Sequence, residues 1–188
     1  MYLYGVKRVD ITELDESTGT AKVSGKKFTV KTAQKVELEP VVSEGEESIL
    51  RNSSNILAVV RTDDLLYGYD LTFTDNSFDP ELAGLVAGYK VTGSDSTLKV
   101  ETPMGSEGVI GKPFKMEIYV ANYDGDSIQS YVKVTLNKCY GKFMNMSLGD
   151  EFYAPEFTVK ARENTKASLP IKQIEVVTSL PVESSSVS

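Results

Sequence analysis

Histidine and tryptophan are absent from this sequence of 188 residues, and cysteine occurs only once. Without histidine the chain lacks the commonest general base and the commonest metal ligand. Ser-His-Asp and Cys-His mechanisms and histidine-containing zinc sites are therefore excluded. The single cysteine, Cys139, can form neither an internal disulfide nor a four-cysteine metal site. It ends a predicted strand, so we expect a packed, small hydrophobic side chain rather than a reactive thiol.

Long apolar runs are also missing. No stretch approaches the roughly 18 apolar residues of a membrane-spanning helix, so we expect no membrane span. The opening residues 1–5 lack the basic patch and the long apolar run of a signal peptide. We therefore expect the protein to be made and to fold in the cytoplasm.

Positive charge is in short supply. The chain has 27 acidic and 20 basic side chains, which gives a net charge of −7. Sequence-independent binding to nucleic acid depends on Lys and Arg side chains that neutralise phosphates. We therefore expect contact with DNA to be weak or repulsive.

Most of the sequence shows a period-two alternation of apolar and polar side chains. Because successive side chains of a strand point to opposite faces, this alternation predicts half-buried strands of an antiparallel sheet. The clearest strands are predicted at residues 65–74, 114–121, 128–137 and 157–161. Weaker patterns predict strands at residues 2–14, 27–32, 35–42, 97–101, 143–148 and 171–177.

Three local signals add detail to this pattern. The Asp-Gly pair at residues 124–125 predicts a tight hairpin turn, because glycine tolerates the positive φ that such turns require. Residues 56–60, Ile-Leu-Ala-Val-Val, are apolar on both parities, which predicts a central strand covered on both faces. Residues 43–55 are a long polar connection, and loops of this length are generally functional or mobile.

One helix is predicted, at about residues 79–88. Asp79 can accept hydrogen bonds from the first free amides, and Pro80 suits the first turn because it has no amide hydrogen to leave unpaired. Gly88 can take the left-handed conformation that closes a helix. The stripe that we expect to pack on the sheet consists of Leu82, Leu85 and Val86.

The fold class that these patterns predict is mainly β. We expect an antiparallel sandwich or barrel-like domain over residues 1–178, with one short flanking helix and with residues 43–55 as a protruding loop. The Ser-rich and Val-rich tail at residues 179–188 is expected to be flexible.

Sites for catalysis or cofactors find no support in the sequence. Residues 105–113 are Gly-rich, but their spacing differs from that of a phosphate-binding loop, and Pro113 stands where such a loop needs Ser or Thr. The acidic segments 75–79 and 124–126 do not have EF-hand spacing, and turn or helix-cap chemistry explains both. We therefore expect no cofactor, no metal and no enzymatic activity.

Two long segments resemble the major tail proteins of phages and prophages of Gram-positive bacteria. Residues 56–92 read ILAVVRTDDLLYGYDLTFTDNSFDPELAGLVAGYKVT, which resembles the central strand pair and the Asp-Pro-capped helix of that family. Residues 118–163 resemble its C-terminal half, notably in YVKVTLNKC and EFYAPEF. The opening residues 4–8, YGVKR, are also similar.

The resemblance implies a β-sandwich that assembles into six-membered rings, which stack into a hollow tube. In that family a sheet of each subunit lines the lumen, DNA passes without specific binding, and a long loop reaches the adjacent ring. By this analogy residues 43–55 are the inter-ring loop, with contacts from Glu44, Glu46, Glu47, Ile49, Leu50 and Arg51. The implied partners are copies of the same chain and other tail proteins, such as the tape measure, the terminator and the baseplate or tip. The implied location is the virion tail, which is assembled in the cytoplasm of the host bacterium.

Other functions stay open at this point. The 10 tyrosines leave room for a carbohydrate-binding or receptor-binding β-sandwich, although the lack of tryptophan weighs against it. A tail terminator is a related structural role. A hydrolase based on two carboxylates is a third possibility, which the lack of tryptophan also disfavours, and residues 43–55 could be merely a mobile loop.

Overall fold

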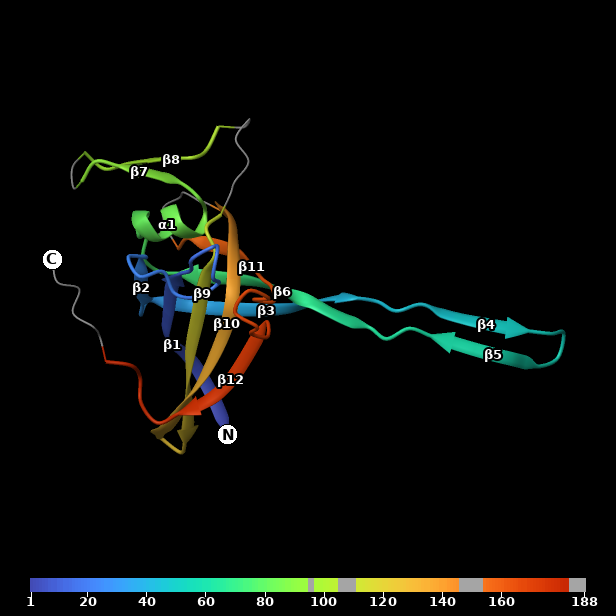
Figure 1. The fold of residues 1–188 in the computed structure, drawn as a ribbon. Helices are drawn as coiled ribbons and strands as arrows, with labels where there is room; N and C mark the ends of the chain where they lie inside the picture. Colours follow the sequence, from blue (N-terminus) through green and yellow to red (C-terminus); the bar gives the residue numbers. More distant parts are fainter. Residues whose placement is uncertain (95–96, 105–110, 146–153, 183–188) are drawn as a thin grey trace.

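The computed structural model describes residues 1–94, 97–104, 111–145 and 154–182 (Figure 1). Within these ranges the chain is mainly β with antiparallel pairing and one short helix, as the sequence predicts. The elements in chain order are β1 (Tyr2–Glu13), β2 (Lys27–Val30), β3 (Ala33–Ser43), β4 (Glu47–Arg51), β5 (Ile56–Arg61), β6 (Leu65–Asp75), α1 (Pro80–Val86), β7 (Lys90–Thr92), β8 (Lys99–Glu101), β9 (Phe114–Asp124), β10 (Ser127–Asn145), β11 (Glu156–Ala161) and β12 (Lys172–Val177).

Eight strands form the main sheet, in the order β2-β1-β9-β10-β11-β6-β3, with β12 added beside β10. Strand β10 has 19 residues and is long enough for two partners on one side. Its first half pairs with β12 and its second half with β11. Strand β1 also contacts β3, near the opposite end of the order, so the sheet curls over on itself and encloses a core.

The core fills the space inside this curled sheet. Phe73 of β6 and Phe157 of β11 are paired in register and stack with their ring centroids 5.8 Å apart. Both rings are fully buried, and truncating a buried Phe typically costs about 3–5 kcal/mol. These strands are therefore held to one another by their inward faces as well as by the backbone ladder.

Helix α1 closes one side of the core, and its predicted signals are confirmed. The Asp79 carboxylate accepts hydrogen bonds from the amides of Glu81 at 2.9 Å and Leu82 at 3.2 Å. Gly88 takes a φ of +71°, just after the helix ends. The predicted stripe is buried: Leu82, Leu85 and Val86.

The predicted hairpin between β9 and β10 is also confirmed. Asp124 pairs with Ser127 across the turn, and Gly125 has a φ of +60°. Two other predictions are only partly covered by the structure. Residues 105–110 of the Gly-rich segment and residues 146–148 of a predicted strand lie outside the described residues.

The prediction for residues 56–60 is wrong. These residues form most of β5, whose every side chain is exposed, rather than a central strand covered on both faces. The prediction that residues 43–55 form a loop is also inaccurate, because Glu47–Arg51 make up β4, which pairs with β5 in a two-stranded sheet. Both errors have the same physical reason: β4 and β5 pair with each other and not with the main sheet.

A hydrogen bond to β1 holds the first part of the C-terminal segment. The Arg8 guanidinium donates a hydrogen bond to the carbonyl of Pro181 at 2.7 Å, so the chain beyond β12 runs back to β1. Residues 183–188 of the predicted flexible tail lie outside the described residues. Among the helices that the structure describes, none is long and apolar enough to cross a membrane.

Candidate functional site

A long β-hairpin projects from the body of the molecule (Figure 1). It comprises β4, β5 and the segments that join them to β3 and β6, and we call residues 44–64 the arm. Every residue from Glu46 to Tyr67 is exposed, a run of 22 consecutive residues that no other part of the described chain covers. All six contact residues implied by the resemblance lie in the arm: Glu44, Glu46, Glu47, Ile49, Leu50 and Arg51.

Hydrogen bonds fix the base of the arm where the pairing of β3 with β6 ends. The Gly45 amide donates to the Asp64 carboxylate at 2.8 Å, and the Glu46 amide donates to the Thr62 hydroxyl at 2.7 Å. A Cβ atom on Gly45 would lie 1.9 Å from the Thr62 carbonyl oxygen, so only glycine fits this close approach. The arm is therefore a direct continuation of the β3–β6 ribbon.

The tip of the arm is a tight turn made by polar side chains. The Asn52 side-chain oxygen accepts hydrogen bonds from the amides of Ser54 at 3.1 Å and Asn55 at 2.7 Å. The Asn52 amide in turn donates to the Asn55 carbonyl at 2.9 Å. Asparagine favours such turns because its short side chain can bond to the backbone two residues on. This turn reverses the chain, so that β4 and β5 pair side by side as antiparallel strands.

Both faces of the arm are apolar. Ile49 is paired with Val59, and Leu50, on the opposite face, is paired with Ala58. Leu50 is 61% exposed and Val60 is 65% exposed. A two-stranded hairpin is marginally stable by itself in water, and exposed apolar patches of this kind mark interaction surfaces. The arm therefore has the composition of an element that another surface covers.

A second candidate surface lies on four neighbouring strands of the main sheet, which we call the four-strand region: β12, β10, β9 and β1. One free edge is the outer side of β12, which pairs only with β10. The other is the first half of β1, because β2 pairs only with Val9 to Thr12. Within the described residues nothing pairs with either edge, and such edges are ready to add a further strand.

One face of the four-strand region carries a balanced set of charges. Arg8 Nε lies 2.7 Å from Asp10 Oδ1. Lys133 forms ion pairs with Glu117, at 3.7 Å, and with Glu175, and its hydrogen bond with Glu175 raises the pKa of its ammonium group. With Lys115, which lies 3.1 Å from Glu117, this face holds three bases and three acids. We call it the charged face.

The opposite face of the same strands is apolar. It reaches the β9–β10 turn, at the end of the sheet far from α1 (Figure 1). Val6, Val120 and Val176 lie on this face in neighbouring registers, as the pairing of β1 with β9, of β9 with β10 and of β10 with β12 shows. Ile174 is 61% exposed and Val176 is 57% exposed. Val6 and Val120 are partly buried against the core, whereas Leu3, Ile174 and Val176 are exposed, and we call these three residues the apolar overhang.

Exposed tyrosines gather where β1 begins. Tyr2 and Tyr4 are each about three-quarters exposed, and Tyr4 meets Tyr123 edge to face at 6.2 Å between ring centroids. The Lys7 ammonium lies 5.8 Å from the centre of the Tyr123 ring. Aromatic rings next to a cation offer both stacking and hydrogen bonding to a ligand or to a neighbouring chain.

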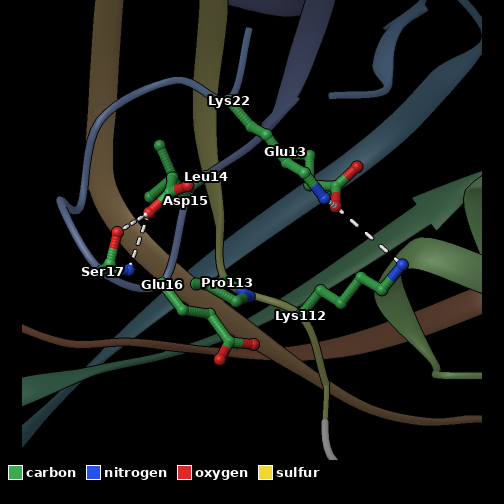
Figure 2. A pocket seen from close by; sticks show the side chains of 8 residues that line it. All are labelled: Glu13, Leu14, Asp15, Glu16, Ser17, Lys22, Lys112 and Pro113. Carbon is green, nitrogen blue, oxygen red and sulfur yellow. Dashed lines mark hydrogen bonds and ion pairs between the residues drawn. The ribbon is translucent and has the colours of Figure 1, made fainter. Parts of the chain in front are cut away.

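A cavity of about 310 Å³ lies beside the end of β1 (Figure 2). Burial raises the pKa of the Glu13 carboxyl there. Hydrogen bonds from the Lys26 amide at 3.0 Å and the Lys22 ammonium at 2.9 Å outweigh that effect, so the pKa lies below its usual value. Hydrogen bonds from the Ser17 hydroxyl and from the Ser17 and Thr18 amides lower the pKa of Asp15. Both carboxylates are therefore already bonded by the protein's own groups, Glu13 by an ion pair and hydrogen bonds and Asp15 by hydrogen bonds alone.

The described residues hold no group of three or more side chains that could bind a metal ion. Sequence reasoning found the arm through its length and polarity, but it missed the apolar half in β5 and the apolar overhang. The signal for β5 was present, because residues 56–60 are apolar on both parities.

Comparison with known proteins gives no further guidance: no protein-family model matches the sequence, and no curated protein matches it.

Proposed function

We propose that this protein is a structural subunit that polymerises with copies of itself, and that the polymer is the tail tube of a bacteriophage. The observation that carries the proposal is the arm, a two-stranded ribbon with apolar side chains on both faces that none of the described residues covers. The resemblance to major tail proteins is the reason for proposing a tail tube as the kind of assembly.

The size of the arm fits an interface between proteins. Twenty of its 21 residues are exposed, all except Gly45, which matches the roughly 20–30 residues that each partner contributes to a standard interface. Fully burying a Val, Leu or Ile side chain contributes at most about 1.5–3 kcal/mol, and the arm has six large aliphatic side chains to bury: Ile49, Leu50, Ile56, Leu57, Val59 and Val60. This gain is enough to offset much of the entropy lost on association.

The free edges of the four-strand region support a ring. Unpaired edges invite indiscriminate association, and joining β12 of one copy to β1 of the next removes both edges at once. A ring built in this way places the charged face of every copy on the same side. If that face lines the conduit, its bases are already paired with acids, so DNA gains little by releasing counterions there.

Electron microscopy of the purified protein over a range of concentrations tests the proposal, together with sedimentation velocity. We expect rings or tubes of uniform width to form as concentration rises. A protein that stays strictly monomeric at every concentration and salt condition would contradict it.

The exposed tyrosines favour one alternative, a carbohydrate-binding module. Tyr2 and Tyr4 present their rings to solvent, as stacking on a sugar requires. A glycan array separates the two functions. Specific binding that the pair of substitutions Tyr2→Ala and Tyr4→Ala abolishes, in a protein that does not polymerise, would favour the alternative.

A further inference from the structure

The arm and the apolar overhang are exposed apolar surfaces at separate places on one chain. The arm points away from the body, whereas the strands that carry the overhang, β1 and β12, lie in the body itself (Figure 1). The arm therefore does not cover the overhang of its own chain, and none of the described residues covers either surface. A second copy of the chain supplies the missing surface in each case.

The charges at the two surfaces are complementary. Between Ser48 and Val60 the arm carries a single charge, Arg51, next to its tip. The overhang residues are uncharged, and beside them the turn between β9 and β10 presents the exposed carboxylates of Asp124 and Asp126. Neither carboxylate makes an ion pair within the described residues. An arm lying on the overhang with its tip at this turn brings opposite charges together.

The base of the arm fixes the direction of docking. Its side chains are mostly acidic, with five acids and one base: Glu44, Glu46, Glu47, Asp63, Asp64 and Arg61. If the arm lay in the reverse direction, this acidic base would meet the acidic turn, and placing like charges together opposes binding. The charge pattern therefore selects one orientation.

We infer that the arm of one copy docks on the apolar overhang of a second copy, with Arg51 beside Asp124 and Asp126. This inference rests on the proposed self-assembly and names the two surfaces that carry it. Because the two surfaces differ, the contact is heterologous, and such a contact repeats to give a ring or an open polymer rather than a two-fold dimer.

Charge reversal tests the pairing. Arg51→Glu alone, or Asp124→Lys with Asp126→Lys, should raise the concentration needed for polymerisation by roughly tenfold or more, since each change places like charges together. Combining all three substitutions should restore polymerisation to within a few-fold of the unmodified protein. Lys142→Glu, an exposed charge reversal on β10 outside both surfaces, serves as the control and should change little.

Apolar variants provide a second test that does not depend on charge pairing. Leu50→Asp in the arm and Val176→Asp in the overhang should each block polymerisation, because both introduce a charge into a buried contact. Val23→Asp is the matched control, since Val23 is fully exposed and lies on neither surface. Circular dichroism and a thermal melt of each variant show that the subunit itself still folds.

The outcomes separate this inference from the proposed function. If the charge-reversed variants and both Asp variants polymerise like the unmodified protein, the docking is wrong while self-assembly stands. Failure of the triple variant to recover would also overturn the pairing of Arg51 with the acidic turn. If the unmodified protein forms no polymer under any condition, the proposed function fails, and this inference fails with it.

Discussion

Glu13 shows how a single buried charge is held by its surroundings. Its side chain is 6% exposed and accepts hydrogen bonds from Lys22 and from the Lys26 amide, with Lys112 at 3.9 Å (Figure 2). Because its pKa is lowered in the folded protein, the stability it contributes is complete above the unfolded pKa and is lost as pH falls through the folded value.

The substitution Glu13→Gln should therefore lower the free energy of unfolding by about 1–2 kcal/mol at neutral pH. The deficit should shrink as pH falls below about 4, because the unmodified carboxylate then becomes protonated as well. Urea unfolding of both proteins across this pH range measures the difference. Glu81→Gln is the control, since the Glu81–Lys26 pair is largely exposed and such pairs contribute little. An equal deficit at acid and neutral pH would show that the charge of Glu13 is not the cause.

Cys139 is fully buried, and burial raises the pKa of its thiol well above the usual range. Since only the thiolate reacts readily, we expect iodoacetamide to leave the folded protein unmodified at neutral pH and to alkylate it completely in urea. Mass spectrometry after each treatment gives the result. Rapid alkylation of the folded protein would show that this part of the core opens easily.

At the scale of secondary-structure elements, the sequence predicts strands well where one face meets the chain's own core. The alternation in β6, β9, β10 and β11 has this origin, and so does the apolar stripe of α1. The same reasoning fails for residues 56–60, because side chains that are apolar on both faces can be covered by a partner chain as well as by the protein's own core. An apolar sequence pattern indicates that burying those side chains is favourable, but it does not indicate whether the same chain or another chain buries them.

The sequence did not predict the overhang, for a different reason. Its strands were predicted, but which of their apolar residues stay exposed depends on the 19-residue length of β10 and on how β11 and β12 divide it. Those are long-range pairings, and the period of a single strand does not encode them. Of the six arm residues named by the resemblance, four lie in β4 and two, Glu44 and Glu46, lie just before it, whereas the partner residues in β5 came only with the pairing register.

Helix α1 meets β10 at a point that tolerates no side chain. A Cβ atom on Gly141 would lie 1.8 Å from the carbonyl oxygen of Val86, at the end of the helix. Gly141→Ala should therefore destabilise the protein by about 2 kcal/mol or more, because the helix or the strand must shift. Gly125→Ala separates this clash from backbone strain: Gly125 has a φ of +60° but open space around it, so about 1 kcal/mol is expected. Thermal unfolding of both variants compares them, and equal losses would mean that the close approach is relaxed in solution.

At the scale of the whole molecule, apolar surface is divided between two kinds of site. One set of side chains fills the core inside the curled sheet, and a second set lies exposed on the arm and the overhang. The described chain therefore has a core of its own and also exposes apolar side chains on the arm and the overhang. Its subunit should therefore fold without partners, while its arm stays accessible until assembly covers it.

Limited trypsin digestion makes this division measurable. Arg51 and Arg61 lie on the exposed arm, where a two-stranded ribbon opens locally far more easily than the core strands do. In the dispersed subunit we expect the first cuts at these two residues, with the rest of the domain left intact and folded. In the assembled protein both cuts should slow by roughly tenfold or more, since protection follows the free energy of opening and the partner must leave first. Mass spectrometry of the fragments over time identifies the sites. Equal cleavage of the arm before and after assembly would show that copies associate through other surfaces, and that the arm reaches for a different partner.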